Sequence, residues 1–205
     1  MKGTTMPTTT KVYDSYSQAR QAVSDLETAG IPSSKISLLA NKYVSEKYDD
    51  VDDVSEAATG AGIGALVGGT AGLLAGLGML AIPGIGPVVA AGWLASTALG
   101  VAAGGATGGF IGALVDAGEP EERAHVYSEA VRRGGTLVSV KADDSQIGKA
   151  QSILNRHTPI DPTVRGAEFR KAGWKKFDPA APAYRPSEAE IERIRADYRE
   201  PADIS

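Results

Sequence analysis

The chain contains no cysteine among its 205 residues. This absence excludes disulfides, thiolate metal sites and a cysteine nucleophile, and it makes the chain indifferent to the redox compartment. Histidine is almost as scarce, with only His125 and His157. Neither stands at a recognisable spacing from a serine or carboxylate partner, so we expect titrating surface residues rather than a catalytic base. The sequence therefore predicts a protein without enzyme activity.

Charged residues are missing from one long stretch, 57–115, although they are dense on both sides of it. The apolar residues are thus concentrated in one part of the chain instead of being spread along it. Residues 1–10 are rich in threonine and lack an apolar core, so we expect no secretory signal peptide. The formal net charge of -4 gives no reason to expect nucleic acid as a partner.

Glycines recur at every fourth position in the charge-free stretch. The first set comprises Gly60, Gly64, Gly68, Gly72 and Gly76, and the second comprises Gly92, Gly100, Gly104, Gly108 and Gly112, with Ser96 in the same period. Between them lies a turn that contains Pro83, Gly84, Gly86 and Pro87. At 3.6 residues per turn, this spacing places each set along one face of a helix. We therefore predict a glycine-zipper helical hairpin over residues 57–118.

Such a hairpin predicts close helix packing in a membrane or in an oligomer. Each helix is long enough for a hydrocarbon core of about 30 Å and carries no charge, which favours membrane insertion. Two spans without a signal peptide would place both termini in the cytoplasm, as in a bacterial inner-membrane protein. The alternative is a buried hairpin inside a soluble cytoplasmic oligomer. Further glycines off the main stripes offer a second smooth surface, which predicts self-association through the hairpin: Gly62, Gly69, Gly78, Gly105 and Gly109.

Two patterns resemble ligand sites without the context that such sites need. Gly62, Gly64 and Gly68 imitate a dinucleotide fingerprint, but an acidic segment precedes them and no acidic ribose ligand follows at the required distance. The acidic segment itself, 43–56, contains too few apolar residues to pack. We interpret it as a solvated linker, with a carboxylate metal site as the sharper alternative. We expect no cofactor and no resident metal, and the sequence does not identify a small-molecule ligand.

The flanking parts, 1–42 and 119–160, show strand and helix patterns that repeat each other. Aligning Val12 with Val140 also aligns Ser17 with Ser145, Gln18 with Gln146, Ala22 with Ala150 and Leu26 with Leu154. Two β-α units with one apolar helix face each would pack on one side of a small antiparallel or mixed sheet. We therefore predict an α+β fold in which a small ferredoxin-like domain is split by the inserted hairpin.

The C-terminal part, 161–205, is rich in proline, alanine and charge. Within 165–177, cations alternate with aromatic residues: Arg165, Phe169, Arg170, Lys171, Trp174, Lys175, Lys176 and Phe177. This pattern fits a membrane-surface or nucleic-acid patch, and it equally fits a tail that wraps its own domain with Trp174 as an anchor. A short helix is predicted over 187–199, with Ser187 and Glu190 as its capping box.

Three segments together carry a resemblance to a known family. They are 12–37 with its Ala29-Gly30-Ile31-Pro32 turn, the hairpin turn 82–87, and the strand 134–140 with the preceding Tyr127. In these segments the chain resembles the bacterial general stress proteins with a YflT-like, heat-induced stress protein domain. The resemblance covers about residues 9–158. It implies an association with heat, cold or general stress, often in the membrane, and no established enzyme activity or ligand.

Two functional hypotheses follow from these patterns. The first is a non-enzymatic, stress-associated protein that inserts in the membrane, associates with it or oligomerises through the glycine-zipper hairpin. The second is a soluble oligomeric regulatory or ligand-binding module with a ferredoxin-like sheet.

Overall fold

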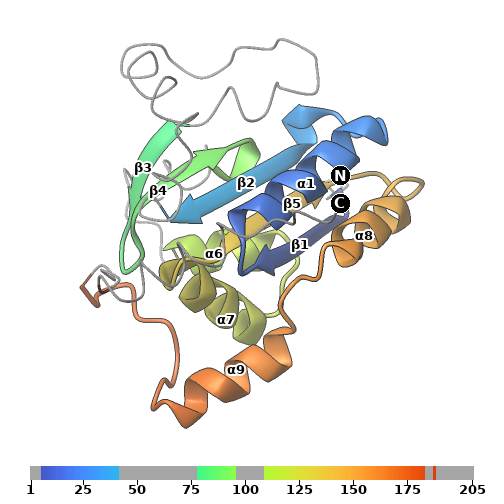
Figure 1. Cartoon of the computed structure of the whole chain (residues 1–205). Helices are drawn as coiled ribbons and strands as arrows, with labels where there is room; N and C mark the ends of the chain where they lie inside the picture. The colour runs from blue at the N-terminus through green and yellow to red at the C-terminus, as the bar shows by residue number, and fades with distance from the viewer. Residues whose placement is uncertain (1–5, 42–77, 96–108, 183–186, 188–205) are drawn as a thin grey trace, which may run out of the picture.

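The computed structural model describes residues 6–41, 78–95, 109–182 and 187. In these ranges the chain forms a five-stranded sheet in the order β1-β5-β2-β4-β3, and each neighbouring pair is antiparallel (Figure 1). The strands are β1 (Thr8–Tyr13), β2 (Ile36–Asn41), β3 (Gly78–Ile82), β4 (Gly86–Ala91) and β5 (Thr136–Lys141). The predicted α+β class is confirmed.

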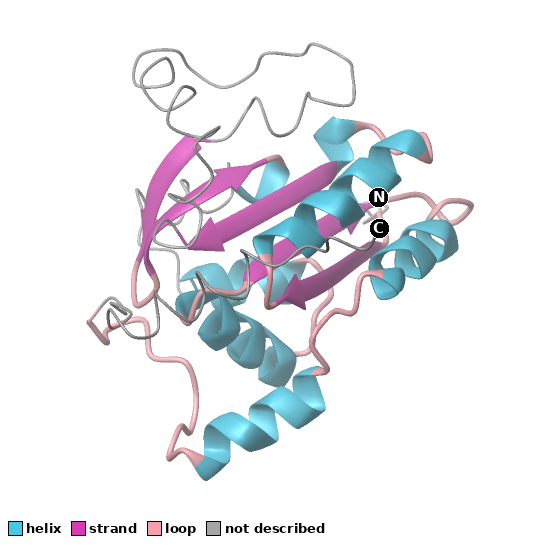
Figure 2. Cartoon of the chain, in the orientation of Figure 1, coloured by secondary structure: helices cyan, strands magenta, loops and turns pink. Residues whose placement is uncertain are grey.

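Helices cover both faces of the central strands (Figure 2). They are α1 (Tyr16–Thr28), α6 (Gly109–Asp116), α7 (Glu121–Arg132), α8 (Ile147–Arg156) and α9 (Pro162–Lys171), and a short 3-10 helix, η1 (Ser33–Lys35), leads into β2. Helices α1 and α8 pack on one face. Helix α7 packs on the other, with α6 and α9 against it. The core therefore has two layers, one on each side of the sheet.

Strand alternation assigns the apolar residues to the two layers. Leu39 and Leu137 belong to the core under α7, whereas their neighbours Leu38 and Val138 belong to the core under α1 and α8. All four side chains are fully buried. Because both faces of β2 and β5 are covered, these strands need apolar residues at successive positions, which explains their unbroken buried runs.

The internal repeat seen in the sequence corresponds to two β-α units. The alignment of Val12 with Val140 carries Thr8 to Thr136 and Tyr13 to Lys141, which are the bounds of β1 and β5. These two strands pair with each other, and the helices that follow them, α1 and α8, lie on the same face of the sheet and contact each other. The prediction that both helices share one face of an antiparallel sheet is confirmed.

The finer ferredoxin-like topology is not established. Strand β5 lies between β1 and β2, so the β1-α1-β2 unit is split by an antiparallel strand, as in ferredoxin-like folds. However, β4 and β3 extend the sheet beyond β2. In the part of the chain that the structure describes, α8 is followed by α9 rather than by a strand that returns to the sheet.

Residues 78–82 and 86–91 form strands, where the sequence analysis expected the ends of two helices on either side of a turn at 82–87. Strands β3 and β4 pair from Gly78 with Ala90 to Ile82 with Gly86, and the turn between them is closed by the Ile85 N–H, which donates to the Ile82 carbonyl at 3.0 Å. Val88 and Ala90 contribute to one core layer and Val89 to the other. The apolar residues 88–91 of β4 are therefore buried in a sheet, whereas helix is present at 109–116.

The predicted transmembrane hairpin is corrected by the same observations. None of the helices formed by residues 6–41, 78–95 and 109–182 is both long and apolar enough to cross a membrane. This finding overturns membrane insertion as the main interpretation, together with the inner-membrane location and the placement of both termini that depended on it.

Candidate functional site

Most of the predicted helix-packing glycines lie outside the described residues. This applies to Gly60, Gly64, Gly68, Gly72, Gly76, Gly100, Gly104 and Gly108. The two that are described occupy different environments. Gly112 lies in α6, where an added Cβ would have no heavy atom within 4 Å. Gly92 lies directly after β4, where the chain is very crowded.

Gly92 permits a close approach between the end of β4 and the start of β2. Its φ is +82°, and an added Cβ would lie 2.0 Å from the carbonyl oxygen of Ile36. The Leu94 N–H then donates to the buried Ser37 hydroxyl at 3.0 Å. Only glycine provides both the left-handed backbone and the space for this contact. The residue therefore fixes the junction between two strands.

The turn residues Pro83, Gly84, Gly86 and Pro87 lie between β3 and β4. Gly84 and Gly86 have φ values of +77° and +104°. An added Cβ on Gly84 would lie 2.6 Å from the carbonyl oxygen of Asp178. The chain after α9 thus lies directly against the β3–β4 turn.

Residues 162–182, which comprise α9 and the chain after it, wrap around the rest of the domain. Phe169 and Phe177 are 7% and 2% exposed and belong to the core under α7, and the Trp174 ring meets Phe169 edge-on with 5.6 Å between the centroids. Arg165 forms two hydrogen bonds of 2.7 Å to Asp14, and Arg170 pairs with Glu122. The aromatic residues of 165–177 and two of its cations are therefore engaged within the chain.

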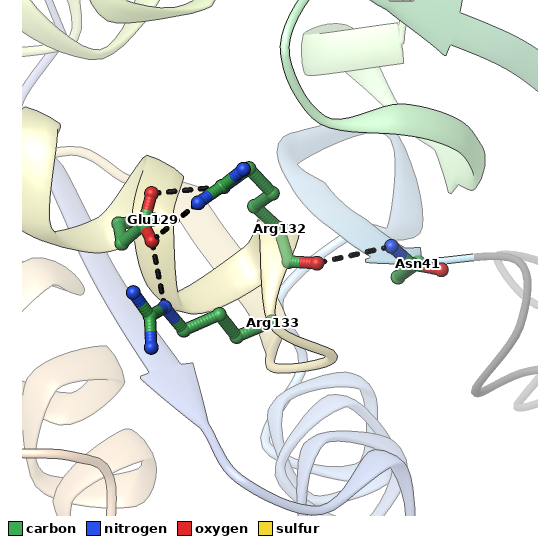
Figure 3. A network of polar contacts seen from close by, with 4 residues as sticks. All are labelled: Asn41, Glu129, Arg132 and Arg133. Atoms are coloured by element: carbon green, nitrogen blue, oxygen red, sulfur yellow. Dashed lines mark hydrogen bonds and ion pairs between the residues drawn. The ribbon is translucent and has the colours of Figure 1, made fainter. Parts of the chain in front are cut away.

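A buried carboxylate at the C-terminal end of α7 is the most concentrated polar group (Figure 3). Glu129 is 1% exposed. Both of its oxygens accept hydrogen bonds from Arg132, at 2.9 and 3.0 Å, and Oε1 also accepts one from Arg133 at 2.6 Å. The Asn41 amide donates to the Arg132 carbonyl at 3.3 Å, and the Arg133 guanidinium lies 4.7 Å from the centre of the Phe169 ring.

These contacts join three elements and neutralise the buried charge. The carboxylate has two guanidinium partners, as a buried ion needs, and the network links α7 to the last residue of β2 and to α9. Sequence reasoning did not single out Glu129. The sequence nevertheless contains a signal for this network. Arg132 and Arg133 follow Glu129 by three and four positions, and residues at these spacings are neighbours on a helix.

Hydroxyl groups line the buried face of the sheet under α7. Thr10 and Ser139 share a hydrogen bond of 2.9 Å, and the Tyr127 hydroxyl donates to the Thr10 carbonyl at 3.4 Å. On the opposite face, the Tyr13 hydroxyl donates to the Leu154 carbonyl at 2.8 Å. Burial raises the pKa of both tyrosines well above its ordinary range. These phenols therefore stay protonated and tie helices to strands.

The two histidines lie on helices or at their ends. His157 follows α8, and its Nε2 lies 3.1 Å from a carboxylate oxygen of Asp25 on α1. His125, on α7, has its Nε2 3.8 Å from Glu121. Each is adjacent to one carboxylate on a neighbouring turn or helix. Within the described ranges, no group of three or more His, Asp and Glu side chains is placed to hold a metal ion.

The two edges of the sheet differ. On β1, the Val12 carbonyl accepts a hydrogen bond of 2.8 Å from the Ile160 N–H, so the chain after α8 covers part of this edge, and Lys11 adds a charge. On β3, no other strand of the described ranges pairs with the outer edge. No residue from 78 to 95 is charged. The side chain of Met79 is 57% exposed.

Comparison with protein-family models, with curated proteins and with solved structures found no match to the chain.

Proposed function

We propose that the chain is a non-catalytic interaction module that binds an extended strand along β3. The observation that carries this proposal is the difference between the two sheet edges. The β1 edge is partly covered and carries a charge, whereas β3 is an uncharged edge strand with an exposed methionine. This corresponds to the module expected as the alternative from the sequence.

The backbone of β3 supplies specific hydrogen-bonding groups for such a partner. In an antiparallel pair, successive residues direct their N–H and C=O groups alternately toward and away from the neighbouring strand. The Ile82 carbonyl faces inward, because it accepts a hydrogen bond from Ile85 across the turn. By alternation, the N–H and C=O groups of Ala81 and Met79 face outward. They are the donors and acceptors that an added strand would engage.

The sequence of β3 lacks the usual devices that keep an edge strand unpaired. Natural edges carry a lysine, a proline or a bulge that prevents another strand from docking. Strand β3 reads Gly-Met-Leu-Ala-Ile without any of these, and its pairing with β4 is continuous. A strand edge without any of these features is expected to bind a partner strand. The resemblance to general stress proteins adds the expectation that this use belongs to a stress response.

The proposal is tested with a synthetic peptide that carries the sequence of residues 78–82 between lysine pairs. Titrated into isotope-labelled protein, it should shift the NMR amide signals of Met79 and Ala81 and leave those of β1 unchanged. Ala81→Pro should abolish the response, since proline removes an outward N–H while leaving the bonds to β4 intact. Ala81→Ser, which keeps the N–H, is the matched control. A response confined to β1, or none at all from a sample that is monomeric, would refute the proposal.

A further inference from the structure

We infer that the strand received by β3 is the β3 strand of a second copy of this chain. Two copies related by a two-fold axis would then share one continuous antiparallel sheet. This inference rests on the proposed function, because it names the partner that the β3 edge takes. It also assigns a different contact from the glycine stripes that the sequence suggested for self-association.

The first argument is the symmetry of the backbone. Two identical strands that lie antiparallel are related by a two-fold axis, so every outward donor of one copy meets an outward acceptor of the other. The outward groups of β3 are those of Met79 and Ala81. They are two positions apart, which is the spacing at which a strand repeats its outward hydrogen-bonding pattern. The edge is therefore complementary to itself without any adjustment of its backbone.

The second argument is the absence of charge. Like charges directly opposite each other destabilise a strand pair, and a charged edge would therefore select a partner of opposite sign. From residue 78 to residue 95 there is no charge of either sign. Nothing in this segment repels a second copy, and nothing in it favours an acidic or basic partner over a copy of itself.

The third argument is the apolar surface that pairing would cover. Met79 pairs with Val89, a residue of the core under α1 and α8, so its side chain lies on that face of the sheet. Ala81 lies on the same face and is also exposed. In the paired sheet, Met79 of one copy would lie opposite Ala81 of the other, and the two Met79 side chains would be diagonal neighbours on one face. An exposed apolar strip on each copy would thereby be covered.

The position of β3 agrees with this arrangement. Helix α1 packs on β1, β2 and β5, and α8 packs on β1. Figure 1 shows β3 at the edge of the sheet opposite to α8. On the face covered by α1 and α8, the described helices therefore lie over the centre of the sheet and its β1 side, and no strand of the described ranges continues the sheet beyond β3.

A charge-swap experiment on the full chain tests the inference. Analytical ultracentrifugation should show a concentration-dependent dimer for the unmodified chain. Met79→Lys and Met79→Glu should each dimerise at least about tenfold more weakly, because the two introduced like charges would be diagonal neighbours on long side chains across the two-fold axis. An equal mixture of the two variants should restore the dimer. Val164→Lys is the control, because Val164 is 58% exposed on α9 and is not on the edge.

Circular dichroism of each variant shows whether the fold is kept, and Ala81→Pro gives a second route to a monomer that introduces no charge. A dimer that withstands all three substitutions would place the contact elsewhere and overturn the inference.

An unmodified chain that stays monomeric while the peptide of residues 78–82 still binds would overturn the inference and leave the proposed function intact. A monomer that ignores the peptide would overturn both. A monomer whose Ala81 amide is nevertheless protected from exchange would show that another segment of the same chain fills the edge, which also overturns the inference.

Discussion

Replacing Gly92 with alanine tests the strand assignment of residues 86–91 at its most crowded point. An added Cβ would lie 2.0 Å from the Ile36 carbonyl oxygen and 2.8 Å from the Ser37 Cα, and φ is +82°. The matched control is Gly118→Ala. Gly118 has a φ of +95°, but no heavy atom lies within 4 Å of its added Cβ. Both changes introduce the same kind of backbone strain, and only the first adds a collision.

The expected magnitudes follow from these distances. A left-handed backbone costs an alanine about 1–2 kcal/mol, and this cost applies to both variants. Contacts below 3.0 Å essentially never occur for a real Cβ, so in Gly92→Ala the end of β4 must move away from β2. That movement separates the Leu94 N–H from the Ser37 hydroxyl, and a buried donor without a partner costs about 1–3 kcal/mol. Together these two costs predict a loss of about 2–5 kcal/mol for Gly92→Ala, against about 1–2 kcal/mol for Gly118→Ala.

Urea unfolding followed by circular dichroism measures both losses. In a chain of this size, each kcal/mol corresponds to about 2–4 °C in the melting temperature, so a thermal melt should separate the two variants by several degrees. A glycine on a helix stripe would have an ordinary helical φ and would tolerate alanine without backbone strain. Equal destabilisation by the two substitutions would therefore refute the close contact between β4 and β2.

Three further predictions concern the packing of the core. Glu129→Gln should lower the free energy of unfolding by about 2 kcal/mol, less than for a fully buried ion pair because both arginine partners retain contact with water; chemical denaturation measures it. The raised pKa values of Tyr13 and Tyr127 mean that the folded chain holds these protons after the unfolded chain has released them. Their contribution to stability is therefore complete below about pH 10 and declines as the pH rises above it, and replacing both by phenylalanine should flatten this alkaline decline in denaturant titrations. Phe177→Ala should cost about 3–5 kcal/mol because the ring is buried in the core, whereas Val164→Ala, on the exposed face of α9, should change the melting temperature very little.

The sequence predicted the two β-α units well because their signals are local. The spacing of Ser15 and Gln18 is typical of a helix start, and the Ser15 hydroxyl accepts a hydrogen bond from the Gln18 N–H at the beginning of α1. A glycine such as Gly30 is typical of a helix end, and its φ of +87° agrees. Asp143 is of a residue type that caps helices, and it accepts a hydrogen bond from the Gln146 N–H before α8. Each of these signals involves residues within a few positions of one another.

The prediction of helix at 78–81 and 88–91 was wrong because a spacing of four residues is ambiguous. Positions i and i+4 share one face of a helix, but they also share one side of a strand, whose period is two. The glycine repeat therefore did not distinguish the two structures. Better signals were Val88 and Val89, which favour strands, and a turn with Gly84 and Gly86, which matches a hairpin between strands.

The sequence could not identify β3 as the candidate interaction edge, for a different reason. Whether a strand lies at an edge depends on the order of all strands in the sheet, and no residue of β3 encodes that order. The Glu129 network could be predicted in part, because Arg132 and Arg133 follow Glu129 by three and four positions on one helix. Its link to Asn41 joins residues far apart in the sequence, and only the fold brings them together.

Residue-resolved amide hydrogen exchange at Ala81 tests the central claim most directly. If β3 pairs with β3 of a second copy, the Ala81 amide should exchange rapidly in dilute protein, as an outward edge amide does. Its exchange should slow as the protein concentration rises through the dimerisation range, while the amides that bond β3 to β4 stay protected throughout. Exchange at Ala81 that does not depend on concentration, whether fast or slow, would contradict the account.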